Sequence, residues 1–330
     1  MAYSVQDLKD RLGKFSRLDL ADLPTPLDRC PRLSGELGGP MVWVKREDQT
    51  GLAMGGNKAR EFEYSVAPAV DEDYDVLLHG AASQSNQSRF TAAVAAKLGK
   101  RCVIVGRKDE HAEPIQGNLM LTHLFGADVR LSSSAEERDR TIADLKDEGL
   151  KVYNTSSDGY YLRTVSYVDG FIELWGQLQA NDVKPDGIYV CSGVHTHTGL
   201  VVGAKALRVD VRIVGVSPSP HPNNEKNAQL SEVANEVCKM MDLQLTFTAD
   251  DFETRGDYAG DGYGVPTEGG IEAVNLCAKL EGLLLDPVYS GKAFSGMVDH
   301  IRSGEWKSGQ NLVFVHTGGT PALFAYAGEI

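Results

Sequence analysis

The chain of 330 residues is longer than a single compact core usually is, which predicts two packed lobes. Its formal net charge of -13 argues against a nucleic-acid backbone or an anionic membrane as partner, because both are bound by clustered Lys and Arg. Its apolar runs are far shorter than the roughly 20 residues that cross a bilayer, and its first residues lack the apolar stretch of a signal peptide, so we expect a cytoplasmic protein.

Short β-rich runs alternate with longer amphipathic stretches along the chain. This alternation is typical of an α/β protein with parallel strands. Several runs end in Gly, Ser or Thr just before a helix start, and ligands of open α/β sheets bind at such carboxyl ends. We therefore expect distant loops to converge on one site. The predicted strands cover residues 41–45, 75–80, 101–106, 127–132, 187–192, 211–217 and 311–319.

The first motif is a glycine-rich turn, Gly51–Gly56, that runs into a predicted helix. Asn57 is the expected helix cap and Lys58 lies in the first turn. The positive end of a helix dipole disfavours an ammonium group, so this position favours a neutral, nucleophilic amine. The alternative is an exposed surface lysine.

The second motif, Gln84–Arg89, follows the strand predicted at 75–79 and begins a helix that ends near Leu98. Amide groups and short polar side chains at a helix start suit a carboxylate. A structural cap needs only one such residue, although capping alone stays an alternative. Farther along, the charged segment Ser132–Asp147 predicts a helix with a solvated face.

The third motif, Cys191–Leu200, lies between a strand and a helix. Its amides and hydroxyls can form a phosphate nest without a cationic side chain. His195 and His197 lie two residues apart with no carboxylate nearby, so no metal site is predicted. The five cysteines form no ligand spacing and are expected to be core residues.

The C-terminal motifs place two tyrosines on loops, where each is flanked by Gly or Pro. These are Tyr263 and Tyr289, which can line a site or simply pack. The double glycine 318–319 follows a strand and permits close approach of backbone to a flat ligand.

Taken in this order, the motifs resemble the D-cysteine desulfhydrase and 1-aminocyclopropane-1-carboxylate (ACC) deaminase family. The resemblance runs from Leu23–Leu27 through Trp43–Asp48 and Gly55–Tyr64 to His316–Tyr326. It implies the tryptophan-synthase β-like fold (fold type II) of pyridoxal-phosphate (PLP) enzymes, an α/β fold with two open, twisted, mostly parallel sheets flanked by helices. It also implies a homodimer, a large PLP-binding domain and a small domain; we place these domains at residues 1–57 with 166–330, and at 58–165.

The resemblance also implies roles for single residues. Lys58 holds PLP through a Schiff base, Asn86 lies beside the pyridine ring, and Ser290 or Thr317 meets the ring nitrogen. The expected phosphate ligands are Ser192, Gly193, Val194, His195 and Thr196. The expected substrate ligands are Ser85, Asn86, Gln87, Tyr263 and Tyr289.

The implied reaction starts when the substrate amine displaces Lys58, which then removes the α-proton. A β-leaving group departs, and hydrolysis gives a 2-oxo acid and ammonia. Ser85, Tyr263 and Tyr289 are candidate proton carriers. A neutral hydroxyl at the ring nitrogen, rather than a carboxylate, favours elimination over transamination.

Departures from the family pattern bear on the substrate. Ser290 and Thr317 stand where ACC deaminases have glutamate and leucine, which favours the desulfhydrase branch, whereas Gln87 matches the deaminases. Val194 and His195 stand where relatives have glycines, and the segment Ser156–Thr164 matches neither branch. These changes could mark a different leaving group.

The sequence is most like a D-cysteine desulfhydrase, which converts D-cysteine into pyruvate, hydrogen sulfide and ammonia. Three alternatives stay open. One is ACC ring opening to 2-oxobutanoate and ammonia. Another is loss of sulfite from cysteate, or a related β-elimination, in which Lys292, His195 or Arg163 would supply an extra cation. The last is a PLP-binding protein without turnover.

Overall fold

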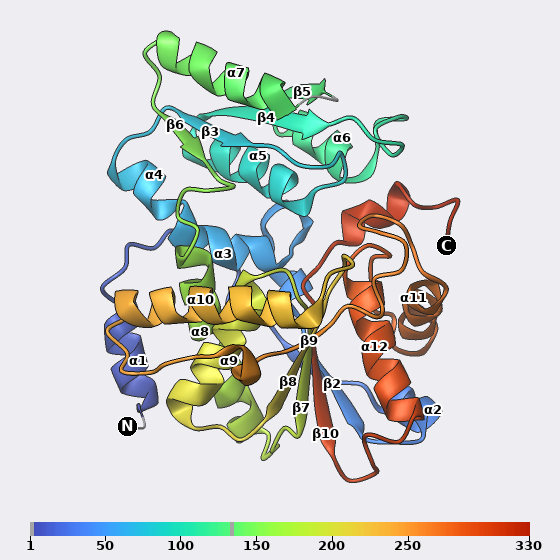
Figure 1. Cartoon of the computed structure of the whole chain (residues 1–330). Coiled ribbons are helices and arrows are strands. Elements are labelled where there is room, and N and C mark those ends of the chain that lie inside the picture. The colour runs from blue at the N-terminus through green and yellow to red at the C-terminus, as the bar shows by residue number, and fades with distance from the viewer. Residues whose placement is uncertain (1–2, 133–134) are drawn as a thin grey trace.

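The computed structural model describes residues 3–132 and 135–330, and it contains two separate sheets (Figure 1). The larger sheet has six strands, which are parallel except that the first two pair antiparallel. Across the sheet the strands are β1 (Leu27–Arg29), β2 (Met41–Lys45), β10 (Asn311–Val315), β7 (Gly187–Cys191), β8 (Arg212–Val216) and β9 (Glu253–Arg255).

The smaller sheet has four strands, and all of its pairs are parallel. Its strands come from one continuous part of the chain. In order across the sheet they are β5 (Asp128–Ser132), β4 (Arg101–Arg107), β3 (Val76–His79) and β6 (Val152–Asn154).

Both sheets are covered by helices on their two faces. One face of the larger sheet carries α1 (Val5–Leu12), α8 (Leu162–Ala180), α9 (His195–Leu207) and α10 (Asn223–Met240), and the other carries α2 (Pro31–Leu37), α11 (Glu268–Glu281) and α12 (Ser290–Arg302). One face of the smaller sheet carries α3 (Asn57–Ser65), α4 (Ala67–Asp71), α5 (Asn86–Leu98) and α6 (Gly117–Leu124), and the other carries α7 (Ala135–Asp147). Short 3-10 helices are η1 (Glu47–Gln49), η2 (Leu52–Met54), η3 (Ala249–Asp251) and η4 (Thr320–Phe324).

Central strands are mainly apolar because both of their faces are covered. In β10, Val313 and Val315 pack with the α8 and α9 side, whereas Leu312 and Phe314 pack with the α12 side. Successive strand residues point to opposite faces, so an uninterrupted apolar run fills two cores.

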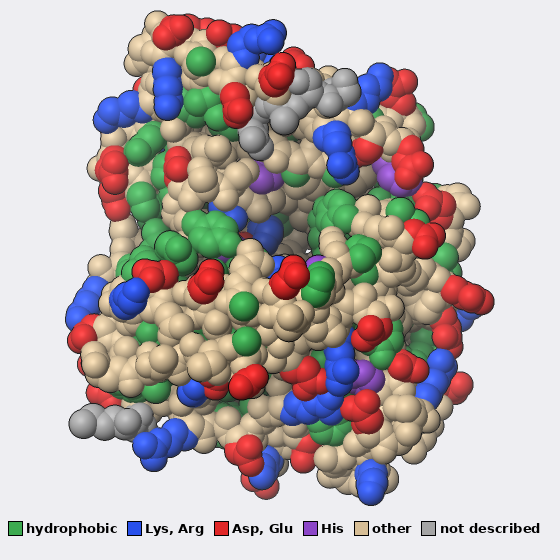
Figure 2. Space-filling model, in the orientation of Figure 1, with side chains coloured by type: hydrophobic (Ala, Val, Ile, Leu, Met, Phe, Trp, Pro, Cys, Tyr) green, Lys and Arg blue, Asp and Glu red, His purple; other side chains and the backbone are tan. Residues whose placement is uncertain are grey.

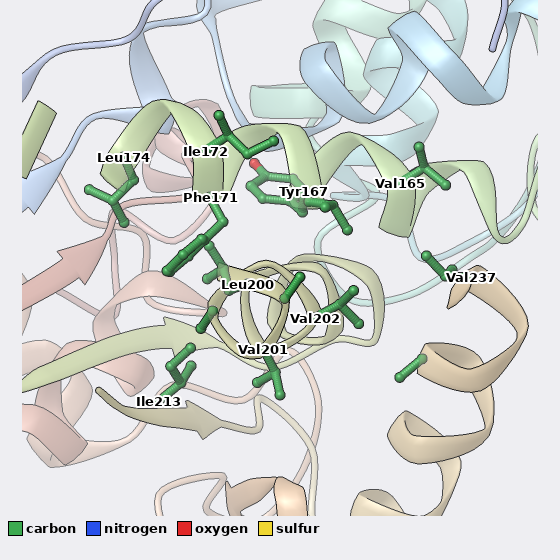
Figure 3. Packing of buried hydrophobic residues seen from close by; sticks show 14 of the residues in the cluster. Val165, Tyr167, Phe171, Ile172, Leu174, Leu200, Val201, Val202, Ile213 and Val237 are labelled. Carbon is green, nitrogen blue, oxygen red and sulfur yellow. The ribbon is translucent and has the colours of Figure 1, made fainter. Parts of the chain in front are cut away.

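The closest helix contact on the larger sheet joins α8 and α9. A Cβ added to Gly199 or Gly203 would lie 2.4 Å or 2.6 Å from the Cβ of Tyr167 or Phe171, so these two glycines let the helices approach. Figure 3 shows α8 lying across α9, with Phe171 on the side of α8 that faces Leu200. This contact fixes where the first residues of α9 lie.

The α/β architecture with two mostly parallel sheets and all seven predicted strands are confirmed. The sequence did not predict β1, β6 and β9, which have three residues each and are too short to show a period. The strands of each sheet fall on the predicted sides of the domain division, whose boundaries stay a prediction. Helix α7 also has a buried side, since Leu145 packs in a cluster with strands of the smaller sheet. Of the predicted charged segment, Ser133 and Ser134 lie outside the described residues.

No helix in the described part of the chain has both the length and the apolar composition needed to cross a membrane. All five cysteines are free and buried, as expected for core residues.

Candidate active site

A cavity of about 290 Å³ lies where loops from both sheets meet. Figure 2 shows a hollow between the part of the molecule with the smaller sheet and the rest, and Lys or Arg and His side chains are visible inside it. Its walls come from segments that follow β3, β7, β8 and β10, as the carboxyl-end rule predicts. The predicted site residues that line it are Lys58, Ser85, Asn86, Gln87, Gly193, Val194, His195, Thr196, Tyr263, Tyr289 and Thr317.

Two predicted cofactor ligands are not among the residues that line the cavity. The Ser192 hydroxyl lies 3.0 Å from Nδ1 of His197. The Ser290 hydroxyl donates to Asp286 Oδ1 at 2.6 Å. Because both hydroxyls are buried and engaged by protein groups, their contact with the cofactor stays a prediction, and Thr317 is the better placed of the two candidates for the ring nitrogen.

The turn before Lys58 brings two distant loops together. Gly56 has a φ of 134° and precedes α3, so Gly56 occupies the cap position and Asn57 is the first helical residue, not the cap. The Asn57 N–H donates to the carbonyl of Thr317 at 3.0 Å. A Cβ on Gly318 would lie 2.7 Å from Gly56 Cα, so Gly318 approaches this turn closely as well as bordering the cavity.

Lys58 lies in the first turn of α3 and faces the cavity, with its side chain 21% exposed. Its Nζ lies 2.8 Å from each carboxylate oxygen of Glu61, whose side chain is fully buried. The expectation of a neutral amine considered only the helix dipole and omitted this carboxylate. The structure adds this carboxylate contact to the dipole argument, and the neutral form of the Lys58 amine stays a prediction.

The start of α5 forms a second wall. The Ser85 hydroxyl caps the helix by accepting from the Ser88 N–H, which is the structural alternative for this residue. Asn86 Oδ1 accepts from Asn118, and Gln87 Nε2 donates to the Thr155 carbonyl at 2.7 Å. These bonds hold three polar side chains at the cavity edge while the first amide groups of α5 lack intrahelical partners.

The start of α9 forms a third wall. Its first N–H groups have no partner within the helix, and a Cβ on Gly193 would meet no described atom within 4 Å, so the backbone there borders open space. Thr196 adds a hydroxyl. Such a concave set of donors suits a phosphate group.

His195, which stands where relatives have a glycine, contacts the segment Ser156–Thr164, which matches neither branch of the family. Its Nδ1 lies 2.9 Å from the Thr164 hydroxyl, and the ring of Tyr160 packs against it in a T-shaped arrangement. Burial lowers the pKa of His195 well below its ordinary value, and the nearby Arg163 guanidinium lowers it further. His195 is therefore a neutral group of the wall, and it was a wrong candidate for an extra cation.

The two other candidate cations are tied to backbone carbonyls. Lys292 is buried and donates to the carbonyls of Ala259 and Gly262, 2.6 and 2.9 Å away. Arg163 donates to the Thr155 carbonyl and is not among the residues that line the cavity. Lys292 therefore positions the loop that carries Tyr263.

The fourth wall carries the tyrosines, whose hydroxyls are hydrogen-bonded to each other. Burial raises the pKa of Tyr289 well above its ordinary value, and the adjacent Tyr263 raises it further. Desolvation also raises the pKa of Tyr263. A tyrosine hydroxyl is ordinarily protonated near neutral pH, so both hydroxyls can donate a proton, and the raised pKa makes each a weaker acid than a free tyrosine.

Sequence reasoning missed several residues of this site. Glu61 could have been found from its i+3 spacing to Lys58 on a helix. His79, Cys191 and Pro218 also line the cavity. Asp286 was missed because its role is indirect: its carboxylate accepts from the backbone of the turn that presents Tyr289, with N–H groups 2.8–2.9 Å away.

The cavity residues fit the PLP that the resemblance implies. Lys58 offers a primary amine for an aldehyde, and the start of α9 with Thr196 offers neutral donors for a phosphate. The Glu61 carboxylate, 3.4 Å from the Thr196 hydroxyl, is the acidic group of this wall. No group of three or more His, Cys, Asp or Glu side chains in the described residues could hold a metal ion.

Comparison with known proteins shows the family of the chain. The family model described as pyridoxal-phosphate dependent enzyme matches residues 18–318. The chain is 40% identical to a D-cysteine desulfhydrase from Salmonella choleraesuis (strain SC-B67), over 96% of this chain and 97% of the relative. It is 38% identical to a 1-aminocyclopropane-1-carboxylate deaminase from Pseudomonas syringae pv. syringae (strain B728a), over 96% and 98%. A crystal structure described as an ACC deaminase homologue has a TM-score of 0.87 at 30% identity and covers 98% of both chains.

Proposed function

Because the chain belongs to the family of pyridoxal-phosphate dependent enzymes, we propose that it is a carbon-sulfur lyase that converts D-cysteine into pyruvate, hydrogen sulfide and ammonia. The observation that carries the proposal is the convergence on one cavity of Lys58, the start of α9 and the paired hydroxyls of Tyr263 and Tyr289. An amine, an anion site and a proton donor are the groups that such an elimination requires.

Lys58, Asn86, Thr317 and the start of α9 would hold the cofactor. When bound, PLP supplies an electron sink for the bonds to the α-carbon of an amino acid. Lys58 Nζ, once displaced by the substrate amine, takes the α-proton as general base. Ser85, Asn86, Gln87 and the first amides of α5 would bind the substrate carboxylate, because helix starts favour anions.

The tyrosine pair would supply the proton that the departing sulfur needs. Tyr289 is held by the turn that Asp286 organises, and its hydroxyl, like that of any tyrosine near neutral pH, carries a proton. Tyr263 hydrogen-bonds to it and lies on the loop that Lys292 anchors. A protonated, positioned hydroxyl can donate to a leaving thiolate and later recover a proton through its partner.

The desulfhydrase branch is favoured by Ser290 and Thr317, which by resemblance replace the glutamate and leucine of ACC deaminases. Thr317 lines the cavity, whereas Ser290 is committed to Asp286. ACC deamination stays the second candidate because Gln87, the deaminase-like residue, is presented at the cavity edge. Loss of sulfite from cysteate has weaker support, since neither Lys292 nor Arg163 lines the cavity.

A substrate panel tests the proposal. Purified protein is given D-cysteine, ACC, L-cysteate and D-serine, and the 2-oxo acid formed is measured. We expect D-cysteine to give the highest kcat/KM and to release sulfide; preference for ACC would make the protein a deaminase. An absorbance band of bound PLP that disappears in Lys58→Ala, without turnover of any amino acid, would support the binding-protein alternative.

The assembly and location of the protein are also proposals. We propose a homodimer, which is supported by exposed apolar side chains on α6 and η4, two elements that contact each other: Ile115 precedes α6, Met120 and Leu124 lie in it, and Phe324 lies in η4. Five free thiols suit a reducing compartment such as the cytoplasm. Light scattering of wild type and Phe324→Glu would test the dimer, and cell fractionation would test the location.

A further inference from the structure

Glu61 is a fully buried carboxylate at the wall of the cavity, three residues after Lys58. Its oxygens each lie 2.8 Å from Lys58 Nζ. Oε1 also accepts from the Asn57 amide at 3.1 Å and from the Thr196 hydroxyl at 3.4 Å. Glu61 thus contacts both the amine proposed to hold the cofactor and the helix start proposed to hold its phosphate.

The surroundings of Glu61 leave Lys58 as its direct cationic partner. Arg163 and Tyr167 of α8 interact with it electrostatically, but Arg163 donates to the Thr155 carbonyl and Tyr167 donates to Glu47. A carboxylate without exposure to water needs a cation or several donors to stay charged. The buried Glu61 carboxylate therefore depends on Lys58 as its direct cationic partner.

We propose that Glu61 binds Lys58 Nζ each time this nitrogen is displaced from the cofactor, first as a hydrogen-bonded amine and then, once it has taken the α-proton, as an ammonium, and so acts as the positioning residue of the general base. The inference rests on the proposed function. The substrate amine takes the place of Lys58, which leaves as a free amine. The Cα–H bond then breaks, its electron pair stays on the amino acid, and its proton bonds to Lys58 Nζ. The resulting ammonium lies against Glu61.

This role has a consequence that a merely structural role lacks. The contact between free Lys58 Nζ and Glu61 exists only when Lys58 is displaced, as a hydrogen-bonded amine or as an ammonium, so Glu61 stabilises the displaced state relative to the state in which Lys58 is bonded to PLP. Removing the charge of Glu61 should therefore make it harder for an amino acid to displace Lys58 from the cofactor. It should not weaken retention of the cofactor. Damage to the fold would weaken both.

The test compares holoenzymes of wild type, Glu61→Gln and Glu72→Gln. Glu72 is exposed and does not line the cavity, so Glu72→Gln makes the same change of charge at a distant position. Each is titrated with alanine, which has no leaving group, in the enantiomer that the substrate panel selects, and the absorbance of bound cofactor reports displacement. We expect the apparent Kd for alanine to rise about tenfold in Glu61→Gln, as for loss of one charge-assisted hydrogen-bonded pair. Cofactor remaining after dialysis should equal or exceed the wild-type value, and Glu72→Gln should match wild type in both measurements.

An unchanged alanine Kd in Glu61→Gln, or a parallel loss of alanine affinity and cofactor, would overturn the inference. Wild-type protein that binds no cofactor would instead reject the proposed function. If Glu61→Gln does not fold, Glu61→Asp serves in its place, because it keeps the charge but shortens the reach to Lys58. Its Kd should rise about threefold, from partial loss of the pair, and an unchanged value would equally overturn the inference.

Discussion

The hydroxyl groups of Tyr263 and Tyr289 are hydrogen-bonded to each other at the cavity wall. Their rings meet in a T-shaped arrangement with centroids 5.7 Å apart. A tyrosine is ordinarily protonated through the neutral range, and burial and Tyr263 raise the pKa of Tyr289 further. At the scale of single residues, the pair is therefore a source of protons.

Replacing Tyr289 with phenylalanine removes the donor but keeps the ring. We expect kcat for D-cysteine to fall about 100-fold, the lower range for loss of a general acid, while the absorbance of bound cofactor is retained. Tyr258→Phe is the matched control, because that hydroxyl donates to Asp299 outside the cavity, and it should keep wild-type kcat. Loss of the cofactor band in Tyr289→Phe would mean that Tyr289 is structural.

Helix α3, which carries Lys58, is held in place by a buried ionic network. Arg60 donates to Glu47 at 2.8 and 2.9 Å and to Glu173 of α8 at 3.0 Å. Lys45 of β2 pairs with the same Glu173. Burial acts to raise the pKa of Glu47, but the adjacent Arg60 cation outweighs burial, and the pKa falls to about 2. At the scale of elements, this network joins α3 to α8 and to the larger sheet.

Arg60→Met would remove the cation that Glu47 and Glu173 share, and Glu47 is buried while Glu173 is only partly exposed. We expect the free energy of unfolding to fall by about 3–5 kcal/mol, as measured by urea denaturation followed by tryptophan fluorescence. Arg302→Met breaks an exposed pair with Glu272 and should cost less than about 1 kcal/mol. Equal effects of the two substitutions would contradict the view that the buried network holds α3.

The whole molecule buries several histidines in neutral form. His195, His197 and His316 each have a pKa lowered chiefly by desolvation, for His197 to about 4. In the unfolded chain the same groups accept a proton near pH 6.5. Between pH 6.5 and the lowered pKa of each folded-state histidine, the unfolded state binds more protons than the folded state, so acidification favours unfolding.

The free energy of unfolding should therefore be highest above pH 6.5 and should fall as the pH is lowered from 6.5 to 5. Each buried histidine contributes up to about 1.4 kcal/mol per pH unit in this window. Urea denaturation at pH 5, 5.5, 6, 6.5 and 7.5 measures the slope, and His197→Gln should reduce it. Stability that stays constant or rises on acidification would show that these histidines are not neutral in the folded state.

Local patterns in the sequence were enough to predict seven of the ten strands in the described residues, the α/β architecture and most of the predicted site residues that line the cavity. Strands with two covered faces are continuous apolar runs, and the turns that follow them carry Gly, Ser and Asn, so Lys58, Ser85 and Thr196 could be assigned to the ends of elements. The resemblance then connected these ends to one cofactor. These features depend on neighbouring residues, so they are readable without a structure.

The sequence by itself thus determined the fold class, the family and the amine at the head of α3. Only the tertiary structure decided which side chains meet that amine and which lie behind the wall. Glu61 pairs with Lys58, while Ser192 and Ser290 bond to protein groups outside the cavity. The physical reason is that a side chain's charge state and direction depend on packing between segments far apart in the chain, and no local period records those contacts.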